Sequence, residues 1–257
     1  MTMAVGFICY DGIVIAADRQ VTGRHYTFEE SKMTSFMWAN GHGVLAYAGE
    51  RDTQLEVARQ FKPRFELAKE MSPADIREAL SESLSATLRK KEVFQTLFGY
   101  WNNDTPQVLL MSNGNDRVVD VPQCEVIGYG DSPLARFLLG RLTEISQYGV
   151  SVRQARVYAT YFISQAKKYD GQYVGGGIDI YSIDHSCKYE QLCTRLIKAG
   201  REWEDEINLF QNKMDLLFHR VADTKNDLKC EIAMREFSPS FKRFKNWIGI
   251  KGWPWSK

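Results

Sequence analysis

The sequence has no strong excess of one charge and no cysteine pattern typical of a metal site or a disulfide framework. Its 33 Lys and Arg residues oppose 32 Asp and Glu residues, a formal net charge of +1. The charge of the whole chain therefore does not favour a nucleic acid or an acidic partner. The five cysteines are odd in number and contain no CxxC pair, which argues against a zinc ribbon or a secreted disulfide scaffold. No metal ligand set is predicted.

The long apolar segments of membrane and exported proteins are also missing. The first residues contain no basic stretch followed by an apolar core. No later run reaches the ~20 apolar residues that cross a bilayer as a helix. With 257 residues, 44% of them hydrophobic and 25% charged, the composition is typical of one large or two small globular domains. We expect a soluble, cytoplasmic protein with no membrane partner.

Two apolar runs at the start of the chain, 5–9 and 13–17, flank Asp11-Gly12. An Asp-Gly pair between apolar runs is a strong signal for a β-hairpin. If the initiator methionine is removed, Thr2 begins the first strand with a free amine beside its own hydroxyl. Asp18 ends the returning strand, near that amine. Because such a threonine carries both a nucleophile and a base, Thr2 is a candidate catalytic residue.

The remaining elements up to residue 183 fall into groups and do not alternate. Helices are predicted from apolar spacing and from the N-cap residues Ser72 and Ser151, and strands from short apolar runs next to glycines or turns. The order of strands, two helices, strands, two helices and a strand predicts an α+β fold with sheets between helical layers. The expected elements are a strand at 44–49, helices at 51–69 and from 72, strands at 108–111, 118–121 and 124–130, helices at 134–148 and from 151, and a strand at 175–183.

The character of the chain changes after Tyr189. From Trp203 to Val221, apolar residues recur at steps of three and four, which predicts a helix docked on its own domain or, alternatively, a subunit contact. Residues 238–257 contain five basic and five aromatic residues and no acidic one. We favour packing of this tail on a neighbouring surface over binding to nucleic acid or a membrane. The predicted parts are a domain at 2–190, a helical extension at 191–236 and a basic aromatic tail at 237–257.

Several short motifs between residues 2 and 183 occur together in one order. They are Thr2-x-x-x-Gly6, Asp11-Gly12, Ala16-Ala17-Asp18-Arg19, Lys32, Ala48-Gly49 and Ile127-Gly128-x-Gly130. With these motifs the sequence resembles the proteasome β-subunit family of N-terminal-nucleophile hydrolases, and among them the bacterial relatives such as Anbu and the two-component heat-shock peptidase. The resemblance implies a four-layer αββα sandwich, to which the C-terminal helical extension is added, in agreement with the element order above.

The resemblance assigns catalytic roles to four residues. It implies that Thr2 is the nucleophile, that Asp18 and Lys32 are its supporting acid and base, and that Gly49 supplies a backbone N–H to the oxyanion. The chemistry is consistent with these residue types, because an α-amino group with a pKa of ~8 accepts a proton near neutral pH. A cationic lysine beside it stabilises developing negative charge, and an aspartate holds that lysine in place.

Specificity residues are implied in the same way. The position of Tyr47 corresponds to the floor of the first specificity pocket, that of Arg51 to its wall, and the edge around Thr22 pairs with the substrate backbone as an added strand. A tyrosine floor predicts a shallow pocket, and Arg51 predicts a preference for acidic side chains. A blocked pocket is the alternative.

Two positions depart from the family pattern. Tyr129 stands between two glycines where active members usually carry a serine. Val174 stands where a second serine is expected, and Asp170 is displaced by one position from the aspartate that accompanies it. In active members these two hydroxyls help to tune the α-amine of the N-terminal threonine, so their absence affects proton transfer to and from that amine. This absence is compatible with a slow enzyme, a different local arrangement or an inactive subunit.

The preferred function is an N-terminal threonine peptidase that cleaves unfolded polypeptide by acyl transfer through Thr2. No cofactor is implied. The resemblance implies a homo-oligomer, either a ring or a helical assembly, with an ATPase unfoldase as a further partner. The alternative is a catalytically inactive proteasome-like subunit with a role in assembly. A third possibility is an amidase for small amides, which shares the chemistry and differs in pocket size.

Overall fold

The structure is a computed structural model. It describes residues 2–23, 26–49, 51–68, 70–87, 94–102, 105–112, 115–128, 149–169, 171–184, 205–213, 235, 237–240 and 242–243. The chain divides into two compact units, residues 1–200 and 201–257. This division into units does not test the predicted boundaries of the domain at 2–190, the helical extension at 191–236 and the tail at 237–257, which stay a prediction. The predicted helix at 134–148 lies outside the described residues, as do most of the stripe at 203–221 and most of the tail.

The predicted N-terminal hairpin is confirmed and forms the centre of a four-stranded sheet. β1 (Met3–Cys9) pairs antiparallel with β2 (Gly12–Asp18), and Cys9 lies opposite Gly12 at the turn. β10 (Cys124–Gly128) pairs with β1, and β11 (Ile178–Asp184) pairs with β2, so the strand order is β10-β1-β2-β11. Nearly every residue of β1 and β2 is buried, which explains why these strands are continuously apolar.

A second, five-stranded antiparallel sheet has the order β5-β6-β7-β8-β9. Two of its strands, β5 and β7, were not predicted from the sequence. Its strands are β5 (Met33–Trp38), β6 (Gly41–Ala48), β7 (Gln95–Asn102), β8 (Thr105–Ser112) and β9 (Asn115–Asp120). The backbone of β7 lies close to the other sheet at Gly99, where a Cβ would stand 2.7 Å from Cγ1 of Ile15.

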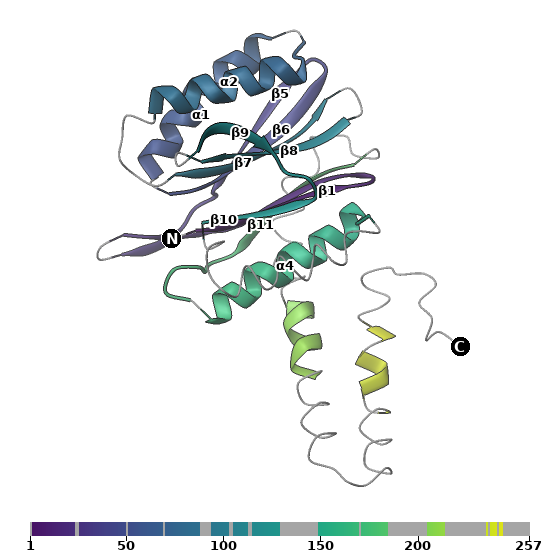
Figure 1. Cartoon of the computed structure of the whole chain (residues 1–257). Helices are drawn as coiled ribbons and strands as arrows, with labels where there is room; N and C mark the ends of the chain where they lie inside the picture. Colours follow the sequence, from purple (N-terminus) through teal and green to yellow (C-terminus); the bar gives the residue numbers. More distant parts are fainter. Residues whose placement is uncertain are drawn as a thin grey trace. The chain divides into compact units, whose positions relative to one another are not determined.

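The two sheets lie face to face between layers of helices (Figure 1). α1 (Arg51–Leu67) and α2 (Pro73–Thr87) cover the outer face of the five-stranded sheet, and α4 (Val152–Tyr169) covers the outer face of the four-stranded sheet. This is the four-layer αββα sandwich that the resemblance implied, and it agrees with the α+β order of elements predicted from the sequence.

The helices begin where their capping residues predicted. The Ser72 hydroxyl accepts from the backbone N–H of Asp75 (3.2 Å), and an Asp75 carboxylate oxygen accepts from the N–H of Ser72 (2.8 Å). Ser151 and Gln154 form the same reciprocal pair at the start of α4. Such capping boxes satisfy N–H groups that have no partner within the helix.

The two core layers differ in composition. Between α1, α2 and the five-stranded sheet the core is rich in aromatic side chains, whereas the core between the two sheets is mostly aliphatic. The apolar stripe predicted on α1 points into the aromatic layer, where Phe61 and Phe65 are completely buried.

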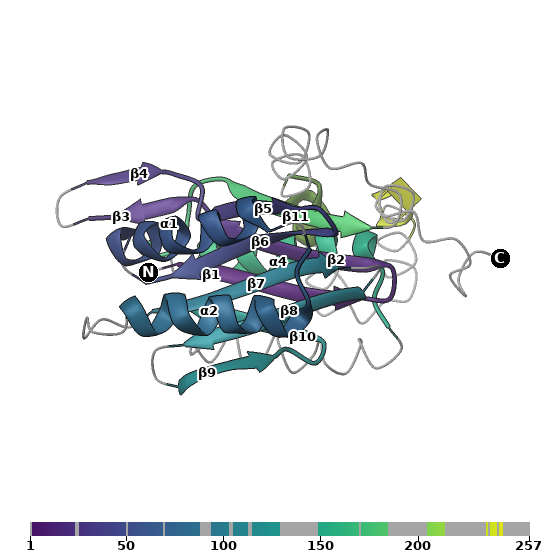
Figure 2. The ribbon, with the colours of Figure 1, turned by 90° about the horizontal axis from the view of Figure 1, so that it is seen from above.

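A two-stranded ribbon leaves the sandwich beside the start of α1. β3 (Gln20–Thr22) continues directly from β2 and pairs antiparallel with β4 (Thr27–Glu29), and the ribbon extends past one end of the sheets (Figure 2). Tyr26 and Phe28 lie on it with 64% and 40% of their surface exposed, and their ring centroids are 5.8 Å apart. This ribbon forms one wall of the site described below.

The second unit contains a described helical stretch at 205–213. Ile207, part of the predicted stripe, is buried, and Phe210 packs against Phe237 with ring centroids 5.7 Å apart. Arg243 forms an ion pair with Glu206. Among the described helices of the chain, none is both long and apolar enough to cross a membrane.

Candidate active site

Thr2 lies directly before β1 and is 6% exposed. Its backbone is fixed by β10, where Gly128 is paired with Met3. Gly128 has a φ of +76°, and a Cβ at this position would stand 1.9 Å from the carbonyl oxygen of Thr2. Only glycine can therefore occupy position 128 without moving Thr2. This close approach explains the glycine that follows the apolar strand in the sequence.

Asp18 ends β2 beneath Thr2 and is completely buried. Its Oδ1 accepts a hydrogen bond from the backbone N–H of Met3 at 2.9 Å. Its Oδ2 accepts from the N–H groups of Gln20 and Gly175, each at 3.2 Å. Because buried polar atoms need hydrogen-bond partners, these contacts satisfy both oxygens of Asp18 and fix its carboxylate next to the start of the chain.

Lys32 provides the counter-ion. Its Nζ donates to both carboxylate oxygens of Asp18 at 2.9 Å, and its side chain is only 2% exposed. Burial lowers the pKa of the Lys32 ammonium, and the charge and hydrogen bonds of Asp18 oppose that shift. An ammonium has three N–H donors, and Asp18 uses two of them. Among the residues that the structure describes, the third donor has no hydrogen-bond partner, and Lys32 lines the same cavity as Thr2.

Gly49 follows β6 with a φ of +133°, a conformation that favours glycine. It lines the same cavity as Thr2 and Lys32. Its predicted role as an N–H donor to an oxyanion stays a prediction.

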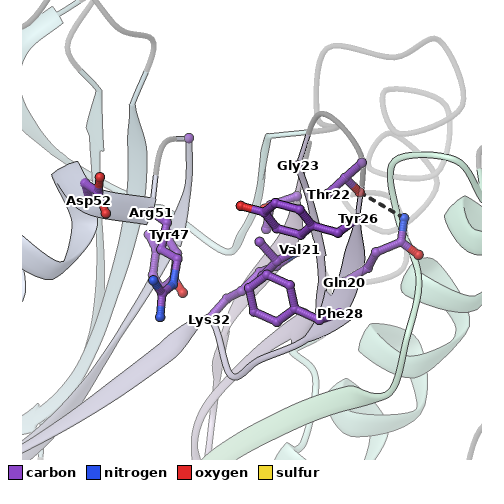
Figure 3. A pocket seen from close by; sticks show the side chains of 12 residues that line it. Gln20, Val21, Thr22, Gly23, Tyr26, Phe28, Lys32, Tyr47, Arg51 and Asp52 are labelled. Carbon is purple, nitrogen blue, oxygen red and sulfur yellow. Dashed lines mark hydrogen bonds between the residues drawn. The ribbon is translucent and has the colours of Figure 1, made fainter.

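These groups meet in a cavity of about 410 Å³ between the β3–β4 ribbon and the start of α1 (Figure 3). Six of the seven predicted site residues line it, and the seventh, Asp18, lies beneath it in contact with Lys32. The lining residues are Thr2, Gln20, Val21, Thr22, Gly23, Tyr26, Phe28, Lys32, Tyr47, Gly49, Arg51 and Asp52.

The wall residue Arg51 is already engaged by a carboxylate that sequence reasoning missed. Its Nε and Nη2 donate to the two carboxylate oxygens of Glu30, at 2.6 and 2.8 Å. The hydrogen bonds and charge of Arg51 lower the pKa of Glu30. Tyr47, the predicted floor, donates its hydroxyl to the carbonyl of Ser31 at 3.2 Å. The positive charge predicted for this pocket is thus balanced by a neighbour.

Aromatic residues of the ribbon were also missed. Tyr26 and Phe28 face the cavity opposite Tyr47 and Arg51 (Figure 3). The only sequence signal for them is the occurrence of two aromatic residues in a short polar stretch between apolar strands.

Of the positions that depart from the family pattern, only Val174 lies among the described residues. Tyr129 and the displaced Asp170 lie outside the described residues. Val174 is completely buried, so its side chain places an apolar group where a hydroxyl was expected. The neighbouring Gly175 contributes through its backbone, whose N–H binds Asp18.

The stretch that contains Val174 is held against β3. Gln20 of β3 makes two hydrogen bonds to this stretch. The N–H of Gln20 donates to the Gly175 carbonyl (3.0 Å), and Nε2 of Gln20 donates to the carbonyl of Gln172 (3.1 Å).

Other reactive groups of the described residues do not form a competing centre. Burial strongly raises the pKa of the Cys9 thiol, which keeps it protonated. The described part of the chain contains no group of three or more His, Cys, Asp or Glu side chains able to hold a metal ion.

Comparison with known proteins gives both a family and a fold. The sequence profile of the family described as "Proteasome subunit" matches residues 2–183. A search of curated proteins found no match. Solved structures with a similar fold include an Anbu (Gly-1) mutant from Hyphomicrobium sp. strain MC1, with 15% identity, coverage of 84% of this chain and 100% of that chain, and a TM-score of 0.60.

Two further structures give similar values. Anbu (ancestral beta-subunit) from Yersinia bercovieri has 15% identity, coverage of 81% of this chain and 96% of that chain, and a TM-score of 0.59. The helical assembly of the Anbu complex from Pseudomonas aeruginosa has 14% identity, coverage of 82% and 96%, and a TM-score of 0.58. These structures establish the fold. Since the family profile spans residues 2–183 of the 257, the chain belongs to the proteasome subunit family.

Proposed function

We propose that this chain is an N-terminal threonine peptidase that cleaves unfolded polypeptide within a self-assembled complex. The observation that carries the proposal is the buried ion pair between Lys32 and Asp18, which adjoins Thr2 at a cavity. A fully buried lysine has a large desolvation penalty, so a structural role alone does not explain its position in the wall of a cavity. Removal of Met1 would expose the amine of Thr2 at the same place.

The reaction follows from these groups. Oγ1 of Thr2 attacks the carbonyl carbon of a peptide bond, and its proton passes to the α-amine of the same residue. The C–N bond breaks as this proton moves to the leaving nitrogen, leaving the acyl group on Thr2 as an ester. Water then attacks the ester and gives a proton to the α-amine, which returns it to Oγ1 as the acid is released.

Lys32 and Asp18 support both steps. The Lys32 ammonium beside the α-amine favours the neutral amine and stabilises negative charge on Oγ1 in the transition state. Asp18 fixes Lys32 through two oxygens at 2.9 Å and binds the N–H of Met3 next to Thr2. One carboxylate therefore positions both the nucleophile's backbone and the lysine.

An extended polypeptide suits the shape of the cavity. β3 carries Thr22 at the cavity wall, and an extended substrate could add a strand along this edge. In a folded protein most backbone N–H and C=O groups are already paired within its own helices and sheets, so an unfolded chain matches this edge better. By analogy with the helical assembly of Anbu from Pseudomonas aeruginosa, we propose a homo-oligomer, with an ATPase unfoldase delivering substrate.

One observation favours the alternative, a catalytically inactive subunit that serves assembly. The buried Val174 side chain cannot provide the hydroxyl that active relatives use near the amine. In that case the ion pair would persist as a remnant of the fold, whether or not Met1 is removed.

Intact mass and an epoxyketone probe, which reacts with both the hydroxyl and the free amine, test the proposal. We expect loss of Met1 and a single adduct. The Thr2→Ala variant should give no adduct and lower peptide hydrolysis by at least ~10³-fold.

The control is Thr105→Ala. Thr105 is exposed and pairs with Asn102 at one end of β7. Ala48, the neighbour of the cavity residue Gly49, pairs with Gln95 at the other end of β7. Thr105 therefore lies at the opposite end of this strand from the cavity. This variant should label and hydrolyse like the natural protein. A sample that lacks Met1 and forms no adduct would instead identify the inactive subunit.

A further inference from the structure

In the connection between α4 and β11, residues 171–175 form a segment that lies against the start of β3. Its last residue, Gly175, donates its backbone N–H to Oδ2 of Asp18 at 3.2 Å. The same oxygen accepts a hydrogen bond from Nζ of Lys32. The position of the 171–175 segment therefore bears directly on the buried ion pair beside Thr2.

Gln20 binds this segment near both of its ends. Its backbone N–H donates to the carbonyl of Gly175 at 3.0 Å and also to Oδ2 of Asp18 at 3.2 Å. Its side-chain Nε2 donates to the carbonyls of Gln172 and Gly171, at 3.1 and 3.4 Å. One residue thus contacts the segment through its backbone and its side chain, and contacts the carboxylate as well.

The fit between Gln20 and Gly175 is close. A Cβ at position 175 would stand 2.0 Å from Oε1 of Gln20 and 2.9 Å from its Cδ, which both belong to the side-chain amide. The next nearest atom, Cβ of Gln20, would be 3.6 Å away, which is an ordinary van der Waals distance. Glycine at position 175 therefore makes room for the amide group of Gln20 in particular.

The amide group is also fixed from the side of the cavity. Gln20 is half-buried and lines the cavity of Thr2, and its Nε2 donates to Oγ1 of Thr22 at 3.2 Å (Figure 3). Because an amide nitrogen carries only two N–H groups, its three acceptors share them and fix its orientation. The buried Val174 offers no hydroxyl, so the segment reaches Asp18 through its backbone. Its effect on Asp18 therefore depends on what holds that backbone in place.

We propose that Gln20 is a positioning residue for the reaction at Thr2. It holds the 171–175 segment so that the N–H of Gly175 stays on Oδ2 of Asp18, and it acts on the nucleophile through that carboxylate and its ion pair. The proposal rests on the peptidase function proposed above. Its physical basis is that a displacement of about 1 Å in a group that supports the reaction can lower the rate by ~10²-fold.

Gln20→Ala removes the amide and leaves the backbone bonds, and two measurements on the full-length protein test it. Hydrogen exchange in peptides that cover residues 171–177 should become at least about tenfold faster, because the segment loses its side-chain contacts. At saturating epoxyketone the rate of adduct formation at Thr2 should fall about tenfold, while the half-saturating probe concentration changes less than about threefold. Unchanged exchange, an unchanged rate, or a loss confined to the half-saturating concentration would overturn the proposal.

Gly175→Ala tests the same contact from the other side and replaces the first variant if Gln20→Ala does not fold. Its Cβ would take the place of Oε1 of Gln20 and displace the amide, so it should reproduce both effects. In Gln20→Ala/Gly175→Ala the displaced group is already absent, and the second substitution should add no further loss of rate. Losses that multiply in the double variant would contradict a shared contact and overturn the proposal.

The matched control is Gln60→Ala. Gln60 is also half-buried, and its Nε2 donates to Oε1 of Glu56 at 3.3 Å, one turn away in α1. This variant should match the natural protein in exchange and in the rate of adduct formation, and an equal loss of rate in both variants would overturn the proposal. If the natural protein lacks Met1 and forms no adduct, the proposed function fails. Exchange in Gln20→Ala then still decides whether Gln20 holds the segment.

Discussion

Two ion pairs border the cavity that contains Thr2, and their environments are opposite. The side chains of Lys32 and Asp18 are 2% and 0% exposed, whereas those of Arg51 and Glu30 are 48% and 34% exposed. Both pairs are bidentate, with distances of 2.6 to 2.9 Å. The geometry is therefore similar, and the difference between the pairs lies in solvation.

Solvation decides what each pair can do. Removing one partner of a buried pair leaves the other charge without compensation in a medium that solvates it poorly. An exposed pair is screened by water, so either partner can be lost or exchanged with little effect on folding. The buried pair is thus suited to hold a fixed charge beside Thr2, and the exposed pair is suited to exchange partners with a substrate.

The largest expected effect is on the buried pair. Lys32→Met should lower the free energy of unfolding by about 3 kcal/mol, because the Asp18 carboxylate loses its counter-ion. It should also abolish epoxyketone labelling of Thr2, since the amine loses the neighbouring ammonium. Urea unfolding and mass spectrometry measure the two effects.

Lys62→Met is the control for this variant. Lys62 is 57% exposed and lies 3.5 Å from Glu66 one helical turn away, so its replacement should leave the urea midpoint and the labelling unchanged. Equal loss of stability in the two variants would contradict the distinction between buried and exposed charges.

The buried pair was predicted from two sources. Asp18 ends the strand that returns from an Asp-Gly hairpin, which is a local signal, whereas the resemblance to the family implied that Lys32 supports Thr2 together with Asp18. The pairing of Arg51 with Glu30 was not predicted, since it requires the β3–β4 ribbon to turn Glu30 back toward the start of α1. No pattern of neighbouring residues indicates such a turn.

The fold shows the same division between local and non-local information. The N-terminal hairpin and the caps at Ser72 and Ser151 depend on adjacent residues, and they were predicted correctly. β5 was missed because its residues alternate between the aromatic core and an exposed sheet edge. β7 was missed because it contains Gly99, a poor strand former that is explained only by the close approach of the second sheet.

The second prediction concerns alkaline pH. Burial lowers the pKa of Lys32 in the folded protein, whereas an unfolded lysine titrates at ~10.4. Between these two values the unfolded chain holds more protons on this side chain than the folded one, so the contribution of Lys32 to stability rises with pH across that window. The difference in unfolding free energy between the natural protein and Lys32→Met should therefore increase as pH approaches ~10.4. A difference that is constant or decreases with pH would contradict the lowered pKa.

The smallest effect on folding, and the most specific effect on function, is expected at the exposed pair. Glu30→Gln removes the carboxylate that occupies Arg51, and the urea midpoint should not change measurably because both side chains remain in contact with water. If the chain is the peptidase proposed above, kcat/KM for peptides with an acidic residue before the scissile bond should rise about threefold to tenfold relative to apolar ones. In Glu30→Gln/Arg51→Gln the gain should disappear, since no cation remains to bind the acidic side chain. Hydrolysis of a matched set of peptides with Glu, Gln or Leu at that position measures the effect, and a gain that is equal for Glu and Gln would contradict a charge-based origin.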